Sequence, residues 1–153
     1  MEQAFETKRV EAQHILTIRA TTTADKLPEL LGAHFGEVYA HIQQNGQQPS
    51  GMPFSRYFAM EGATVDFECG MPVAAPIAGA GRVQAGELPA CTAATVTHMG
   101  PYDDLPKSWN ALLSWMGSQG IEPAGPPWEV YVTDPGAEPD QSKWRTDIFF
   151  PVR

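Results

Sequence analysis

The sequence predicts a single α+β domain made of two β-α-β-β units related by a pseudo-twofold, and three observations lead to this fold class. Residues 46–58 and 120–132 share, without a gap, the frame G-x-x-P-x-G-x-P-aromatic-x-x-Tyr-apolar. An apolar stretch with helical spacing precedes each copy, and a strand-like stretch follows each. The chain of 153 residues is 42% hydrophobic, which suits one domain with a real core. A supersecondary unit used twice predicts antiparallel sheets, with the helices on one side and a ligand cleft at the seam.

The first unit is expected over about residues 8–73. Thr21–Asp25 supplies candidate N-cap residues, and Pro28 suits a first helical turn. Apolar residues then recur at helical spacing as far as Ile42, and Asn45-Gly46 is a left-handed stop signal. The strands expected in this unit are Arg9–Arg19, Phe54–Ala59 and Val65–Cys69.

A connector rich in Ala, Gly and Pro is expected over about residues 74–89, with a short strand near Arg82–Gln84. The second unit then covers about residues 90–153. Asp103–Asp104 is expected to cap a helix whose apolar stripe runs from Leu105 to Met116. The strands expected in this unit are Cys91–His98, Trp128–Thr133 and Thr146–Phe150.

Charge and cysteine content narrow the function. A net charge of −8 argues against nucleic-acid binding and weakly favours a neutral or cationic partner. The 2 cysteines, Cys69 and Cys91, form neither a disulfide framework nor a zinc motif, and we expect them to be small buried residues. We therefore expect no metal and no cofactor. Met1–Glu6 does not resemble a signal peptide, and no apolar run reaches a membrane-spanning length, so the chain is expected to be cytoplasmic.

Several segments, found together in this order, resemble the GyrI-like small-molecule-binding domains, a superfamily that includes the effector domains of BmrR- and Rob-type regulators. The segments that carry the resemblance are Asp66–Val73, Leu88–Ala90, His98–Leu105, Gly125–Pro135 and Pro151–Val152. The resemblance covers nearly the whole chain, and the family's fold agrees with the duplicated unit.

The resemblance implies a cleft between the two units that takes bulky, often aromatic and often cationic compounds. It also implies that the strand Trp128–Tyr131 carries a carboxylate and a tyrosine that face the ligand. Some stand-alone members resemble cyclopropanoid hydrolases, which open a strained ring with water, and others inhibit DNA gyrase by binding it. No segment predicts a helix-turn-helix, so we expect no direct contact with nucleic acid. The oligomeric state is left open.

Strand alternation selects the candidate ligand-binding residues. Glu129 and Tyr131 share one face of their strand, and the apolar Trp128 and Val130 share the other. Assigning the apolar pair to the helix side leaves Glu129 and Tyr131 on the open side. By the repeat, two residues of the first unit lie on the matching face, Ser55 and Tyr57.

Two tyrosines and an acid suit a flat ligand, with the rings stacking and the carboxylate pairing with a cation or positioning water. The alternative is a solvated Glu129 with tyrosines that only pack. Burying a glutamate raises its pKa unless it is paired, and this suits a general base as well as a cation site. If the protein is a hydrolase, Glu129 activates water, and Tyr131 or Tyr102 donates a hydrogen bond where charge develops.

The remaining candidates each have two interpretations. His98 either faces the ligand or fixes the turn before Tyr102, and we favour the turn. Tyr102 is the better pocket residue, whereas Trp109 lies on the helical stripe and either packs in the core or lines the pocket. Asp66 and Glu68 share the open sheet face, but no third ligand completes a metal site, so cleft-rim or solvated charge is expected.

Overall fold

The computed structural model describes residues 4–153. Met1–Gln3, which belong to the segment expected not to be a signal peptide, lie outside this range. The chain forms two compact units, which are described in turn. Unit I is defined as Glu11–Ala90, and unit II as Cys91–Arg153 together with the N-terminal segment that ends at Val10.

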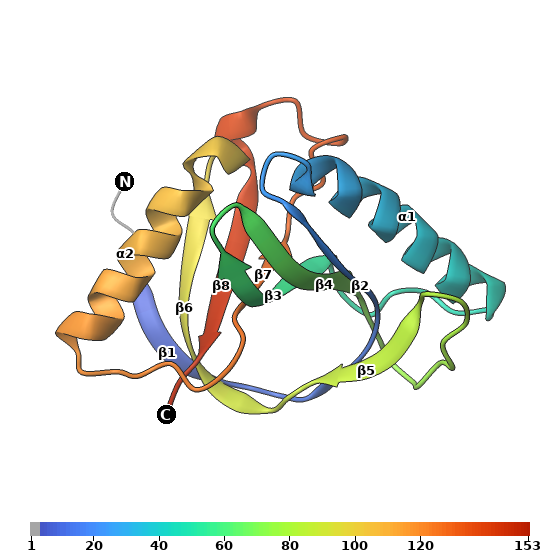
Figure 1. The fold of residues 1–153 in the computed structure, drawn as a ribbon, viewed down its shortest axis with the longest axis horizontal. Helices are drawn as coiled ribbons and strands as arrows, with labels where there is room; N and C mark the ends of the chain where they lie inside the picture. The colour runs from blue at the N-terminus through green and yellow to red at the C-terminus, as the bar shows by residue number, and fades with distance from the viewer. Residues whose placement is uncertain (1–3) are drawn as a thin grey trace. The chain divides into compact units, whose positions relative to one another are not determined.

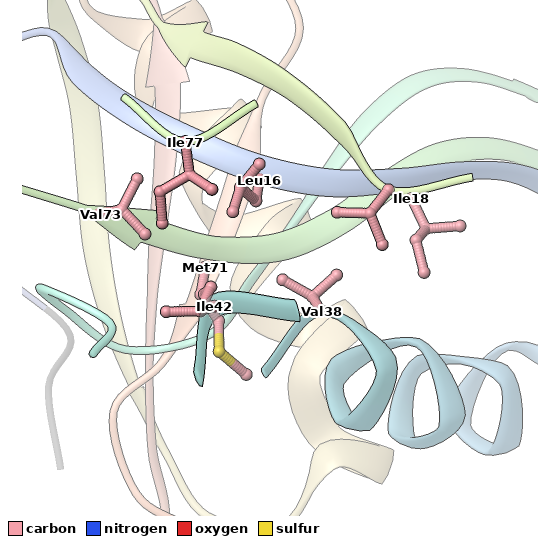
Figure 2. Packing of buried hydrophobic residues seen from close by; sticks show 8 residues of the cluster. Leu16, Ile18, Val38, Ile42, Met71, Val73 and Ile77 are labelled. Atoms are coloured by element: carbon pink, nitrogen blue, oxygen red, sulfur yellow. The ribbon is translucent and has the colours of Figure 1, made fainter. Parts of the chain in front are cut away.

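Unit I is a four-stranded antiparallel sheet with one helix packed on a face (Figure 1). Its elements are β2 (Gln13–Thr23), α1 (Leu27–Gln44), β3 (Phe54–Glu61), β4 (Thr64–Val73) and β5 (Gln84–Leu88). The strand order is β3-β4-β2-β5. Helix α1 packs on β2 and β4 through buried side chains such as Val38 and Ile42, which meet Leu16, Ile18 and Met71 (Figure 2).

Unit II repeats this design. Its elements are β1 (Phe5–Val10), β6 (Cys91–Met99), the 3-10 turn η1 (Tyr102–Asp104), α2 (Leu105–Ser118), β7 (Trp128–Tyr131), the 3-10 turn η2 (Gln141–Lys143) and β8 (Arg145–Pro151). The strand order is β1-β6-β8-β7, again antiparallel. Helix α2 lies along β6 (Figure 1), with Leu112 and Met116 buried against Ala94, Val96 and Ile148.

The two strand orders are the same once β7, β8, β6 and β1 are matched to β3, β4, β2 and β5. Each unit therefore contains a β-α-β-β core, in which the last strand lies between the other two, plus one further edge strand. The prediction of an α+β fold made of duplicated β-α-β-β units is confirmed.

The repeated sequence frame builds the same helix end in both units. Gly46 and Gly120 have φ of 72° and 68°, a left-handed conformation that glycine adopts without strain. In each unit the next residue donates its N–H to a carbonyl five residues back, from Gln47 to Ile42 and from Ile121 to Met116. The proline of each frame then forms a bridge at the end of the hairpin, Pro49 with Val73, the last residue of β4, and Pro123 with Val152, the residue after β8.

The edge strands are exchanged between the units along the chain. Strand β1 precedes β2 of unit I but pairs with β6 of unit II, whereas β5 precedes β6 but pairs with β2. The single strand expected over Arg9–Arg19 is consequently two strands, which break at Glu11-Ala12. The short strand expected near Arg82–Gln84 is β5, which begins where that stretch ends.

The expected helix caps are wrong in detail. Thr21–Thr23 belongs to β2, and Lys26 holds the N-cap position of α1. Pro28 lies in the first turn, as predicted. Asp104 does hold the N-cap position of α2, but its carboxylate pairs with Lys107 at 3.3 Å. Antiparallel pairing extends β2 through the polar threonines to Thr23, because their β-branched side chains fit a strand as well as a cap.

Candidate functional site

Strand register places Glu129 and Tyr131 on the face of the sheet that α2 covers. Glu129 lies opposite Ile148, and Tyr131 lies opposite Thr146. Directly paired residues of antiparallel strands share a face, and Ile148 packs in the core beneath α2. Trp128 instead pairs and stacks with Phe149 on the other face, with ring centroids 5.5 Å apart. The prediction that Glu129 and Tyr131 lie on the open face is wrong.

Ser55 and Tyr57 lie on the helix side of unit I in the same way. Their partners on β4 are Cys69 and Phe67, which form a buried cluster beneath α1, and Tyr57 packs against it. The alternation did identify which residues share a face. It could not tell which face the helix covers, because β7 buries apolar and polar residues on both sides: Trp128 is 1% exposed and Glu129 is 3% exposed.

Three aromatic rings of unit II meet at the end of β7. The ring centroids of Tyr102 and Tyr131 are 5.9 Å apart in an edge-to-face arrangement, and those of Tyr102 and Trp144 are 5.3 Å apart. Trp144 is held by a 2.8 Å hydrogen bond from its Nε1 to the carbonyl of Glu138. No local signal pointed to Trp144, which follows a turn-rich loop and belongs to no periodic pattern. We call Glu129, Tyr102, Tyr131 and Trp144 the aromatic–carboxylate site.

The charge of Glu129 acts on this cluster. Burial raises the pKa of the Tyr102 hydroxyl, and the nearby carboxylates of Glu129 and Asp134 raise it further. Tyr102 therefore stays protonated near neutral pH and can donate a hydrogen bond. The arrangement offers aromatic surface, two tyrosine hydroxyls and a buried carboxylate within one unit.

His98 fixes the turn that leads to Tyr102. Its Nε2 lies 3.1 Å from the carbonyl of Pro101, which can only accept, so Nε2 carries the proton. Its Nδ1 lies 2.7 Å from the Ser108 hydroxyl on α2 and accepts from it in the neutral imidazole. Both ring nitrogens are thus engaged, which confirms the structural interpretation of this histidine.

Trp109 packs against the core of unit II and meets Phe150 edge to face, at 6.2 Å between ring centroids. Ser55, at the repeat position of Glu129, is fully buried, and its Oγ finds no hydrogen-bond partner among residues 4–153.

The carboxylates of β4 lie on the face opposite α1. Asp66 pairs with Arg19 at 2.9 Å, which lowers the pKa of Asp66. Glu68 accepts a hydrogen bond from Thr17 at 3.1 Å and pairs with Arg56 at 3.4 Å in a mostly buried network. The expectation that Glu68 is a solvated charge is therefore wrong. Within residues 4–153, no group of three or more His, Cys, Asp or Glu side chains is placed to hold a metal ion.

Comparison with known proteins shows which family the chain belongs to. Residues 3–153 match the model of the GyrI-like small molecule binding domain, and the chain belongs to that family. No curated protein matched the sequence. No helix within residues 4–153 combines the length and apolar character needed to cross a bilayer.

Solved structures show the same fold at low identity. The EcmrR C-terminal domain is 24% identical with a TM-score of 0.83, and the match covers 100% of this chain and 99% of that one. EcmrR in a complex with DNA has a TM-score of 0.87 at 23% identity; the match covers 99% of this chain and only 57% of that one. SAV2435 bound to tetraphenylphosphonium is 10% identical, with a TM-score of 0.74 and coverages of 98% and 94%. A hydrolase from Listeria innocua is 12% identical, with a TM-score of 0.66 and coverages of 97% and 91%.

Proposed function

We propose that this domain binds a hydrophobic, planar, cationic small molecule, such as a drug or toxin, at the aromatic–carboxylate site of unit II. The observation that carries the proposal is the position of buried Glu129 on the same sheet face as Tyr131, whose ring meets Tyr102. Trp144 extends the aromatic surface. The ligand of SAV2435 is a lipophilic cation, which supports the same chemistry here.

The physical basis is the pairing of ring faces with a buried charge. Aromatic rings attract cations by about 0.5–2 kcal/mol each, most strongly where water is excluded. A buried carboxylate adds selectivity for positive charge, because bringing an anion beside it is strongly unfavourable. A ligand that is both flat and cationic satisfies the rings and the carboxylate together.

Two ions of the same shape and opposite charge test this proposal. Tetraphenylphosphonium and tetraphenylborate are both tetrahedral, so this pair tests the charge alone, and only the cation should bind. A planar acridinium dye tests the flat shape as well and should also bind. Binding can be followed by tryptophan fluorescence, because all 4 tryptophans of the chain lie in unit II. Equal binding of the cation and the anion would show that apolar surface alone drives association and would contradict the proposal.

Substitution of the carboxylate gives the matched comparison. Glu129→Gln should weaken tetraphenylphosphonium binding by about 10- to 100-fold, since a desolvated charge pair is lost. Glu122→Gln removes the same charge from an exposed position of unit II and should leave the affinity unchanged. If both variants bind the cation as tightly as the wild type, the charge-pairing role of Glu129 is wrong.

The further ligand-binding residues expected from the sequence, Ser55, Tyr57 and Trp109, stay predictions, as does the cleft at the seam. Single substitutions Tyr57→Phe and Trp109→Phe in the same titration would show whether either residue contributes to binding.

A second candidate is hydrolysis of a strained electrophilic ring. The arrangement of the site favours it: Glu129 shares a sheet face with Tyr131, whose ring meets Tyr102, so a base and hydrogen-bond donors belong to one site. Glu129 would activate water, and Tyr102 or Tyr131 would donate to the oxygen where charge develops. Glu129→Gln should then lower the rate of water addition to a cyclopropane alkylator by about 10²–10⁴-fold, followed by mass spectrometry. Absence of turnover in the wild type would leave the binding function.

A protein-interaction role of the gyrase-inhibitor type is the remaining alternative. Failure of every cation in the titration, together with direct binding of purified DNA gyrase, would favour it over the small-molecule site.

A further inference from the structure

Thr146 is a buried hydroxyl on the same sheet face as the aromatic–carboxylate site. It lies opposite Tyr131 on β7 and opposite His98 on β6, so these three side chains form one row across the sheet. Thr146 is 0% exposed, and within residues 4–153 its Oγ1 has no hydrogen-bond partner. His98 cannot satisfy it, because both ring nitrogens already engage Pro101 and Ser108. Leaving a buried hydroxyl unpaired is costly, so this group requires a partner.

Unit I shows what the same row looks like when it serves only packing. The matching row there is Tyr57, Phe67 and Ala20, and Phe67 is fully buried in the cluster beneath α1. Unit II thus keeps the tyrosine but replaces a core phenylalanine by Thr146. The hydroxyl stands where the fold elsewhere places an apolar ring, which argues that it does not serve the core.

The spacing relates Thr146 to the charge of the site. Thr146 lies two residues before Ile148, the partner of Glu129 across the strands, so Thr146 and Glu129 are diagonal neighbours. Diagonal neighbours in a sheet are separated by roughly 7–8 Å. A fused bicyclic cation spans this distance.

We propose that Thr146 hydrogen-bonds a polar substituent of the ligand, so that the preferred ligand is a flat aromatic cation carrying a hydroxyl or amine group at the end of the ring system away from Glu129. The proposal rests on the proposed function and adds a specificity-determining residue to it. Thr146 Oγ1 can donate to or accept from such a group, which satisfies the hydroxyl when the ligand is bound.

Isosteric pairs of ligands and variants test it. The probes are N-methylquinolinium cations with a hydroxymethyl group at one ring position each, compared by calorimetry with the ethyl isomers. At least one hydroxymethyl isomer should bind the wild type about tenfold more tightly than its ethyl counterpart, the value of one hydrogen bond. Thr146→Val should abolish this preference, and Thr146→Ser should keep it. Thr92→Val, at an exposed position of β6, should leave the preference intact.

A second readout separates recognition from a structural role. Thr146→Val removes a buried group that has no internal partner, so the Tm of the ligand-free protein should stay equal or rise. A clear fall in Tm would show that the hydroxyl stabilises the fold and would overturn the proposal. So would ethyl and hydroxymethyl isomers that bind equally, or a preference that survives in Thr146→Val. If the ethyl isomers bind and the hydroxymethyl isomers bind no more tightly, only the role of Thr146 is wrong. If none of these cations binds, the proposed function is wrong as well.

Discussion

At the scale of the residue, the two units place different polar groups at the same helix position. His34 and Ser108 each lie twelve residues before the glycine that ends their helix, and each is 1% exposed. Ser108 bonds His98, whereas His34 stacks on Phe67 and directs Nδ1 toward the Cys69 sulfur at 3.7 Å. The repeat thus keeps the buried contact of helix and sheet but not its chemistry.

The buried imidazole of His34 should make the stability of unit I depend on pH. Burial lowers the pKa of His34 below its ordinary 6.5, and the charge of Arg82 lowers it further, against the opposing charge of Glu37. Cys69, the other titratable group facing it, stays a thiol because burial raises its pKa to about 12. Since the unfolded state takes up the proton more readily, the contribution is fully present above pH 6.5 and is lost as pH falls through the lowered pKa.

Denaturation by urea at a series of pH values measures this effect. The free energy of unfolding of the wild type should fall below pH 6.5, and His34→Gln should show a flatter profile. His14→Gln, at an exposed position of β2, should keep the wild-type slope. An unchanged slope in His34→Gln would show that another group causes the acid sensitivity.

At the scale of the element, the two helices end in the same way for the same reason. A left-handed residue after the last turn lets the following N–H reach back to a helix carbonyl, and glycine alone does this without a steric cost. A methyl group added at Gly46 or Gly120 would meet open space, so only backbone strain opposes a side chain there.

Gly46→Ala and Gly120→Ala should each destabilise the protein by about 1 kcal/mol through this strain. Because the two sites lie in separate units, the double variant should lose about the sum. Gly36→Ala is the matched control: its added methyl also meets open space, but in the interior of α1, where alanine should stabilise by about 0.5–1 kcal/mol. Equal effects of Gly36→Ala and Gly46→Ala in chemical denaturation would refute the strain argument.

At the scale of the whole molecule, the sheet of each unit is completed by the strand that leads along the chain into the other unit. Thr7 and Lys8 of β1 pair with Ala94 and Ala93 of β6. The matching residues of β5 are Ala85 and Gly86, which pair with Leu16 and Ile15 of β2. A disturbance of one edge strand should therefore be felt far away along the sequence.

Two adjacent prolines test this. Backbone N–H groups point alternately to the two sides of a strand, so one of two neighbouring residues donates to the paired strand, and proline removes that donor. Thr7→Pro with Lys8→Pro should raise hydrogen exchange in β6 by about tenfold and leave β2 protected, although β2 follows β1 directly. Ala85→Pro with Gly86→Pro should do the reverse. Exchange that rises only in the strand next along the chain would contradict the strand assignment.

The sequence by itself determined the fold class, the helix stops and the shared faces. Gly46 and Gly120 reveal the repeat because the backbone there needs glycine, and the two-residue period of a strand places Glu129 and Tyr131 on one face. These signals are local, so they can be recognised without knowing which segments pair or pack together. The glycine and proline that follow His98 favoured a turn-fixing role, and its contacts with Pro101 and Ser108 then decided between the two interpretations.

Only the tertiary structure decided which strand completes which sheet and which face is covered. The pairing of β1 with β6 and of β5 with β2 depends on contacts between residues distant in sequence, and the break at Glu11-Ala12 carries no strong turn signal. The side of Glu129 depends on where α2 packs, since β7 is buried on both faces. Thr146 joins the site through its register with Tyr131 on β7, and Trp144, just before β8, joins it through its ring contact with Tyr102. No local pattern relates these side chains.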